Sequence, residues 1–125
     1  MSNMSCSLIK HKRIVTTEQK AKELRSYIER LVTYAKKDSL HGRRLIMKKI
    51  RGKLKKEISN ILIHEIAPNY MDRNGGYTRI VKLTNRKNDN ANMSIIEFVS
   101  FKDNTSDDNS AIKAEDTIKE IKPDK

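Results

Sequence analysis

The densest group of residues that could do chemistry is a run of cations within residues 39–56. This segment contains eight Lys and Arg side chains, and no acidic residue lies between Asp38 and Glu57. Like charges at this spacing repel one another unless an anion neutralises them. The phosphates of a nucleic acid suit this role best, because each neutralised phosphate releases condensed counterions. The alternative is a solvated basic face without a dedicated partner.

A second candidate site surrounds the paired glycines at positions 75 and 76. Tyr70 and Tyr77 flank Arg73 in the sequence, and Arg79 and Arg86 follow. Arginine together with tyrosine suits RNA, through phosphate contacts and stacking on unpaired bases. Alternatively, both tyrosines lie at the edge of the core with a hydrated hydroxyl. With the basic helical segments included, the residues that we expect to bind RNA are Lys20, Lys22, Arg25, Arg43, Arg44, Lys48, Lys49, Arg51, Arg73, Tyr77, Arg79 and Arg86.

No constellation of residues indicates an enzyme. The three histidines lie 30 and 23 residues apart, which is not a zinc-binding spacing. Cys6 lies close to the start of the chain, where we expect no ordered catalytic base. The glycine-rich residues 74–77 lead into a predicted strand and not a helix, unlike a phosphate-binding loop. We therefore expect no catalytic residue, no metal, no cofactor and no small-molecule substrate.

Helices are predicted in the first half of the chain. Apolar residues at spacings of four, three and four predict a helix over residues 16–37. Similar patterns predict helices over residues 40–51 and 57–67, and Pro68 is expected to end the last of them. Met4 and Leu8 lie four apart and would fit the last turns of a further helix.

Strands are predicted on either side of these helices. β-Branched residues predict a short strand at 12–16, and alternating polarity predicts a strand over 77–83. A segment rich in Ile, Val and Phe predicts another strand over 93–101. The last two strands most simply form an antiparallel hairpin. The elements together predict an α+β fold, with a small three-stranded mixed sheet packed against about three helices.

Composition limits the class of protein. The chain has 125 residues, of which 34% are charged, and a formal net charge of +11. No apolar run approaches the roughly 20 residues that a membrane span needs. The first seven residues are small and polar and do not resemble a signal peptide, and the single Cys6 fits a reducing compartment. We expect a cytoplasmic protein with no membrane partner.

The charge is divided unevenly along the chain. Residues 1–87 contain 22 basic and 7 acidic side chains, whereas residues 88–125 contain 5 basic and 9 acidic ones. From Lys102 onward the sequence is rich in Asp and Asn and lacks a sustained apolar pattern. We therefore expect an RNA-binding domain over residues 1–101 and a disordered acidic and polar tail over residues 102–125.

Several strings in the sequence are specific enough to suggest a family. The chain resembles the bacterial large-subunit ribosomal protein number seventeen family from about Met4 to Val99. The matching strings are TTEQKAKELR at 16–25, LHGRR at 40–44, EIAPNYMDRNGGYTRI at 65–80 and the strand over 93–99. The resemblance implies a structural, non-catalytic constituent of the large ribosomal subunit near the polypeptide exit region. Its implied partners are large-subunit ribosomal RNA and neighbouring ribosomal proteins.

The sequence departs from the family pattern at two places. Family members usually carry a longer basic segment and a helix before the position of Met4, and Asn69 stands where the family often has arginine. We expect the first departure to weaken RNA binding and the second to remove one phosphate contact. An RNA-binding or regulatory protein that acts off the ribosome is the alternative function.

Overall fold

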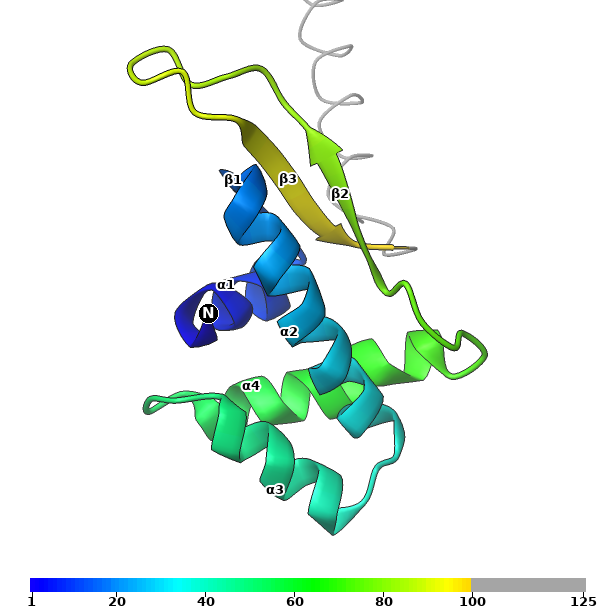
Figure 1. Cartoon of the computed structure of the whole chain (residues 1–125). Helices are drawn as coiled ribbons and strands as arrows, with labels where there is room; N and C mark the ends of the chain where they lie inside the picture. Colours follow the sequence, from blue (N-terminus) through cyan, green and yellow to red (C-terminus); the bar gives the residue numbers. More distant parts are fainter. Residues whose placement is uncertain (100–125) are drawn as a thin grey trace, which may run out of the picture.

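The structure of the chain is a computed structural model that describes residues 1–99 (Figure 1). The predicted tail over residues 102–125 lies outside the described residues. The α-helices are α1 (Ser2–His11), α2 (Glu18–Lys36), α3 (Leu40–Lys49) and α4 (Lys55–Ile61), and the strands are β1 (Arg13–Thr17), β2 (Thr78–Lys82) and β3 (Met93–Phe98). The α+β class is confirmed, with four α-helices in this part of the chain where the sequence predicted about three.

The additional helix is α1, which the sequence pattern indicated only by its last turns. Leu8 and Ile9 are fully buried and anchor it to the body, where it packs against α4, β1 and α2. Lys12 ends the helix in the left-handed conformation with φ 64°, and its backbone N–H donates to the carbonyl of Leu8. This cap turns the chain directly into β1.

The sheet is antiparallel throughout, with β3 in its centre and the order β1-β3-β2. The predicted hairpin of β2 and β3 is confirmed, whereas the expectation of a mixed sheet was wrong because β1 also pairs antiparallel with β3. Ile14, Ile96 and Ile80 lie side by side across the three strands and face the helices. Val15 and Val81 lie on the opposite face of the sheet. They are exposed because no element within residues 1–99 covers that face.

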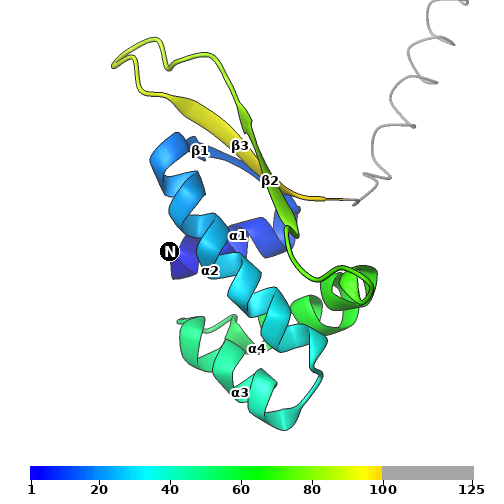
Figure 2. The same cartoon turned by 45° about the vertical axis from the view of Figure 1, so that its right-hand side comes forward.

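Helix α2 forms the axis of the molecule. It contacts all three strands on one side, and α1, α3 and the segment after α4 on others. Figure 2 shows the sheet toward one end of α2 and α3 toward the other. The predicted apolar stripe accounts for this position, because Leu24, Ile28, Leu31 and Ala35 are all buried.

The chain does not leave the helical path at Pro68 as predicted. A π-helical turn, η1 (Leu62–Ile66), follows α4, and a 3-10 turn, η2 (Ala67–Tyr70), contains the proline at its start. Proline lacks an N–H, and the first turn of a helix does not need one, so Pro68 fits there. The continuation carries Tyr70 into the core beneath the ends of β2 and β3.

Helix α3 approaches α2 closely at Gly42. Ser39 caps α3, its hydroxyl oxygen accepting from the Gly42 N–H at 3.0 Å. A Cβ atom at position 42 would lie only 2.6 Å from the carbonyl oxygen of Tyr34 in α2. Because that neighbour is backbone, the two helices would have to move apart to admit any side chain.

We expect Gly42→Ala to lower the free energy of unfolding by about 1–3 kcal/mol, the usual range for overpacking. Urea unfolding measures this. Gly75→Ala is the matched control, because nothing lies within 4 Å of a Cβ atom there. Equal stability of the two variants would show that α3 adjusts to the methyl group without loss of packing.

Candidate nucleic-acid interface

The candidate interface centres on α3 and the residues that follow it. We define the α3 cluster as five cations of this segment that are predicted to bind RNA, which are Arg43, Arg44, Lys48, Lys49 and Arg51. Buried Ile46 and Ile50 hold this segment against the body, and the Ser39 cap fixes its start. Lys48 and Lys49 lie in the last turn of α3, where the helix dipole favours positive charge.

No member of the α3 cluster forms an ion pair with a carboxylate in residues 1–99. Arg44, Lys48 and Arg51 are exposed, whereas Arg43 and Lys49 are half-buried. Lys53, Lys55 and Lys56 continue the exposed charge into the start of α4. The structure therefore gathers the predicted cations on one segment anchored by buried residues, and no carboxylate within residues 1–99 pairs with the α3 cluster.

The predicted cations of α2 are different, because two of them already have partners. Lys22 pairs with Glu18 at 3.0 Å, and Arg25 pairs with Glu29 at 3.3 Å, both one helical turn apart. The pKa of the Glu18 carboxyl is lowered, chiefly by its hydrogen bond from Lys22. Lys20 is exposed near β1 and forms no ion pair within residues 1–99.

The residues at the glycine turn that were predicted to bind RNA differ in their exposure. Tyr77 is 2% exposed, so its ring packs in the core and offers no face to a base. Lys36 donates to the Tyr77 hydroxyl oxygen at 3.1 Å and to the carbonyl oxygen of Arg73 at 2.5 Å. Arg73 itself is exposed and donates through Nε to the carbonyl oxygen of Gly75 at 3.2 Å. These bonds give the turn a structural role around Lys36.

Arg79 points away from that turn, on the outer face of the sheet. It shares the Glu97 carboxylate with Arg13, which the sequence analysis did not select, and the three residues lie in register across the strands. Arg13 donates to Glu97 Oε2 at 2.7 Å from Nε and 2.6 Å from a terminal nitrogen. Burial alone raises the pKa of Glu97, but the hydrogen bonds from Arg13 and Arg79 outweigh it and leave the pKa below its usual value.

We expect Glu97→Gln to lower the free energy of unfolding by about 1.5–3 kcal/mol at neutral pH, the range for hydrogen bonds to charged groups. The folded pKa is depressed, so the contribution of Glu97 is present above its unfolded pKa and is lost as pH falls through the folded value. Chemical unfolding of both proteins from neutral pH to acid measures the difference. A difference that stays constant into acid would contradict the assigned role of the carboxylate.

Arg86 lies in the loop between β2 and β3, at the opposite end of the molecule from α3 (Figure 1). It binds Asp89 through two hydrogen bonds of 2.9 and 2.5 Å. The hydrogen bond from Arg86 is the main reason that the pKa of Asp89 falls to about 2. Arg86 is therefore distant from the α3 cluster, and it already has Asp89 as a counterion.

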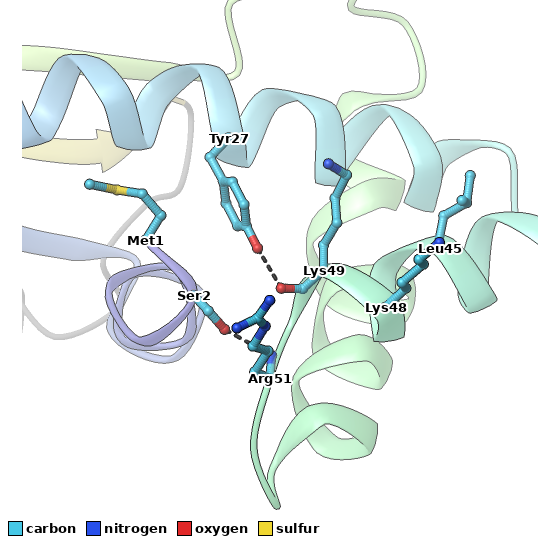
Figure 3. Close-up of a pocket in the computed structure, with 7 residues that line it drawn as sticks. All are labelled: Met1, Ser2, Tyr27, Leu45, Lys48, Lys49 and Arg51. Atoms are coloured by element: carbon cyan, nitrogen blue, oxygen red, sulfur yellow. Dashed lines mark hydrogen bonds between the residues drawn. The ribbon is translucent and has the colours of Figure 1, made fainter.

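A recess beside the α3 cluster involves a residue that the sequence analysis did not select. Tyr27 of α2 donates its hydroxyl proton to the carbonyl oxygen of Lys49 at 2.5 Å, and the Arg51 N–H donates to the Ser2 hydroxyl oxygen at 2.8 Å (Figure 3). Burial raises the pKa of the Tyr27 hydroxyl above its ordinary value. Tyr27 stands beside Ile28 of the apolar stripe, and the helical period alone assigned it no role.

Metal ligands, the single cysteine and membrane-spanning helices were considered within the described part of the chain. Residues 1–99 contain no group of three His, Cys, Asp or Glu side chains that could hold a metal ion. Burial raises the pKa of the Cys6 thiol, which disfavours the reactive thiolate. No helix within the same residues is long and apolar enough to cross a membrane.

Comparison with known families agrees with the basic, non-catalytic surface. The family described as Ribosomal protein L17 matches residues 1–99, which are most of the chain and the whole of the described structure. The match confirms the resemblance seen in the glycine-turn and helix strings of the sequence. The chain belongs to the ribosomal protein L17 family, whose members are structural, non-enzymatic constituents of the large ribosomal subunit.

Proposed function

We propose that this protein binds large-subunit ribosomal RNA through the α3 cluster. The observation that carries the proposal is the set of five cations on one anchored segment, none of which pairs with a carboxylate in residues 1–99. A body containing 22 basic and 9 acidic residues over positions 1–99 adds a favourable long-range field for an anionic partner.

The geometry suits the backbone of folded RNA. A-form helices hide their base edges in a deep, narrow groove, so proteins recognise them largely through phosphates and shape. Exposed Arg44, Lys48 and Arg51 on a short helix and its exit can follow a curved line of phosphates. Binding then gains free energy from counterion release without a large apolar interface.

The predicted cations outside the α3 cluster are proposed as weaker contacts. Lys22, Arg25, Arg79 and Arg86 each hold a carboxylate, so a phosphate must compete with that carboxylate for the same N–H groups. Lys20 and Arg73 are exposed and lie outside the α3 cluster. Contacts with neighbouring ribosomal proteins stay a prediction from the family resemblance.

Co-sedimentation with purified large subunits tests the proposal. We expect the protein to remain with large subunits after a high-salt wash and to bind protein-free large-subunit RNA in a salt-dependent manner. Small-subunit particles are the control for unspecific attraction to RNA. Equal retention on both particles would favour the alternative, an RNA-binding protein acting off the ribosome, over a constituent of the large subunit.

A further inference from the structure

A recess of about 600 Å³ opens where the start of α1, the middle of α2 and the end of α3 meet (Figure 3). This volume lies within the range of about 300–1,000 Å³ that small-ligand sites occupy. We call it the Tyr27 pocket, and its lining residues are Met1, Ser2, Tyr27, Leu45, Lys48, Lys49 and Arg51.

The walls of the Tyr27 pocket combine two chemical characters. Met1, Tyr27 and Leu45 supply an apolar and aromatic surface, and Lys48, Lys49 and Arg51 supply positive charge. No acidic side chain is among the described residues that line it. A ligand that fills the pocket should therefore join an apolar, flat portion to an anionic group.

Hydrogen bonds between elements hold these walls in place. The Tyr27 hydroxyl ties α2 to the Lys49 carbonyl, and the Arg51 backbone N–H is tied to Ser2 of α1. Lys49 places its ammonium nitrogen 5.8 Å from the centre of the Tyr27 ring. Figure 3 shows the ring pointing from α2 toward α3 with Met1 and Lys49 on either side. These contacts therefore join α1, α2 and the end of α3 around the pocket.

We propose that the Tyr27 pocket receives one unpaired nucleotide of the RNA that the α3 cluster binds. The base lies against the Tyr27 ring, where it takes the place of the Lys49 side chain, and its phosphate lies at Lys48 and Arg51. This inference rests on the proposed function, because the same cations continue into the α3 cluster. It adds a preference for RNA with an extruded base, which phosphate contacts alone do not confer.

An unpaired nucleotide fits better than a paired one. A base within a helix is stacked on both faces and cannot enter a recess, whereas a base in a bulge or loop can be turned out and stacked on an aromatic side chain. Every base has a π face, so the aromatic wall tolerates any sequence. The pocket should thus recognise the position of the extruded nucleotide in the RNA more than the identity of its base.

Binding to two RNA duplexes tests the proposal, one with a single-nucleotide bulge and one fully paired. We expect the full chain to bind the bulged duplex more tightly. Tyr27→Ala should weaken binding to the bulged duplex by about 5- to 100-fold, the effect of removing a base-stacking aromatic, with little change for the paired duplex. Tyr27→Leu keeps apolar volume without an aromatic face and should show the same selective loss. It serves as the second variant if Tyr27→Ala folds poorly.

Tyr34→Ala is the matched control. Tyr34 is also half-buried, lies on α2 and packs against the same core, but it does not line the Tyr27 pocket. It should leave the preference for the bulged duplex unchanged. Equal binding of both duplexes by the unaltered chain, or equal losses for both with Tyr27→Leu, would overturn the inference while leaving the proposed function standing.

Two further measurements are needed. One distinguishes a free nucleotide from RNA as the ligand of the pocket, and the other distinguishes failure of this inference from failure of the proposed function. A free mononucleotide should compete only weakly, because it lacks the neighbouring phosphates that the α3 cluster holds; binding as tight as that of the bulged duplex would instead make the pocket a small-molecule site. Failure to bind either duplex and protein-free large-subunit RNA would refute the proposed function itself.

Discussion

Replacing Arg44 and Lys48 with alanine is expected to flatten the salt dependence of RNA binding by about two units of slope, near one for each lost phosphate contact. Around 0.1 M salt this corresponds to roughly a hundredfold loss of affinity, since each contact contributes on the order of tenfold. Both side chains are exposed and pair with no carboxylate in residues 1–99. Binding to protein-free large-subunit RNA over a salt series measures the slope.

The same substitutions should leave the fold intact. Neither side chain belongs to the buried core, so the free energy of unfolding should change by no more than about 0.5 kcal/mol. Removing two like charges from a dense cationic segment also relieves repulsion. A large fall in stability would mean that any loss of RNA affinity reflects a disturbed α3 and not missing phosphate contacts.

The matched control is the double substitution of Lys22 and Arg25 with alanine. It removes the same number of positive charges from the exposed side of α2, but each of these cations already neutralises a glutamate. We expect a smaller change of slope from this control. An equal change would show that the general positive field of the protein attracts RNA and that the α3 cluster has no special role.

The sequence predicted the helices and strands well because their signals are local. The apolar stripe of α2 and the alternation in β2 depend on residues a few positions apart. Helix α1 was predicted only in part because it is short and two buried residues, Leu8 and Ile9, anchor it. Its stability comes from packing against other elements, and no local pattern records that.

The direction of β1 and the path after Pro68 could not be predicted for the same reason. About eighty residues separate Arg13 from its partner Glu97, and nothing in either segment specifies how they pair. Pro68 disfavours a helical conformation at the residue before it, yet burial of Tyr70 holds the chain in a further helical turn. Tertiary packing overrides the local preference there.

The sequence predicted which residues make up the candidate site, but not which of them form ion pairs with carboxylates. The cations of residues 39–56 form an accessible group as expected, because a run of like charges leaves no acid close in sequence. Whether a distant carboxylate neutralises a cation depends on the fold, as Arg79 and Glu97 show. The burial of Tyr77 likewise depends on the fold, because its polarity and its neighbours in the sequence do not reveal that its ring is buried.

Tyr70 is expected to be among the residues whose loss most destabilises the protein. Its side chain is 1% exposed, and its ring centre lies 5.3 Å from that of Tyr77 and 6.3 Å from that of Phe98. Its hydroxyl donates to the carbonyl oxygen of Val99 at 2.5 Å and so ties η2 to the end of β3. Tyr70→Ala should lower the free energy of unfolding by about 3–5 kcal/mol, as for other large buried aromatics.

Tyr70→Phe separates the ring from the hydroxyl and provides a test with a defined pH dependence. It should cost only about 1 kcal/mol at neutral pH, because the ring stays and one hydrogen bond is lost. Burial raises the pKa of Tyr70 from 10 to about 12. The neutral hydroxyl is therefore favoured in the folded state, and its contribution is complete below pH 10 and is lost as pH rises through 12. Unfolding by urea at neutral and alkaline pH should show the original protein losing its advantage over Tyr70→Phe in that window. An advantage that persists above pH 12 would mean that burial does not hold the hydroxyl protonated.

Equal stability of Tyr70→Ala and Tyr70→Phe would show that packing of the ring does not join η2 to the sheet.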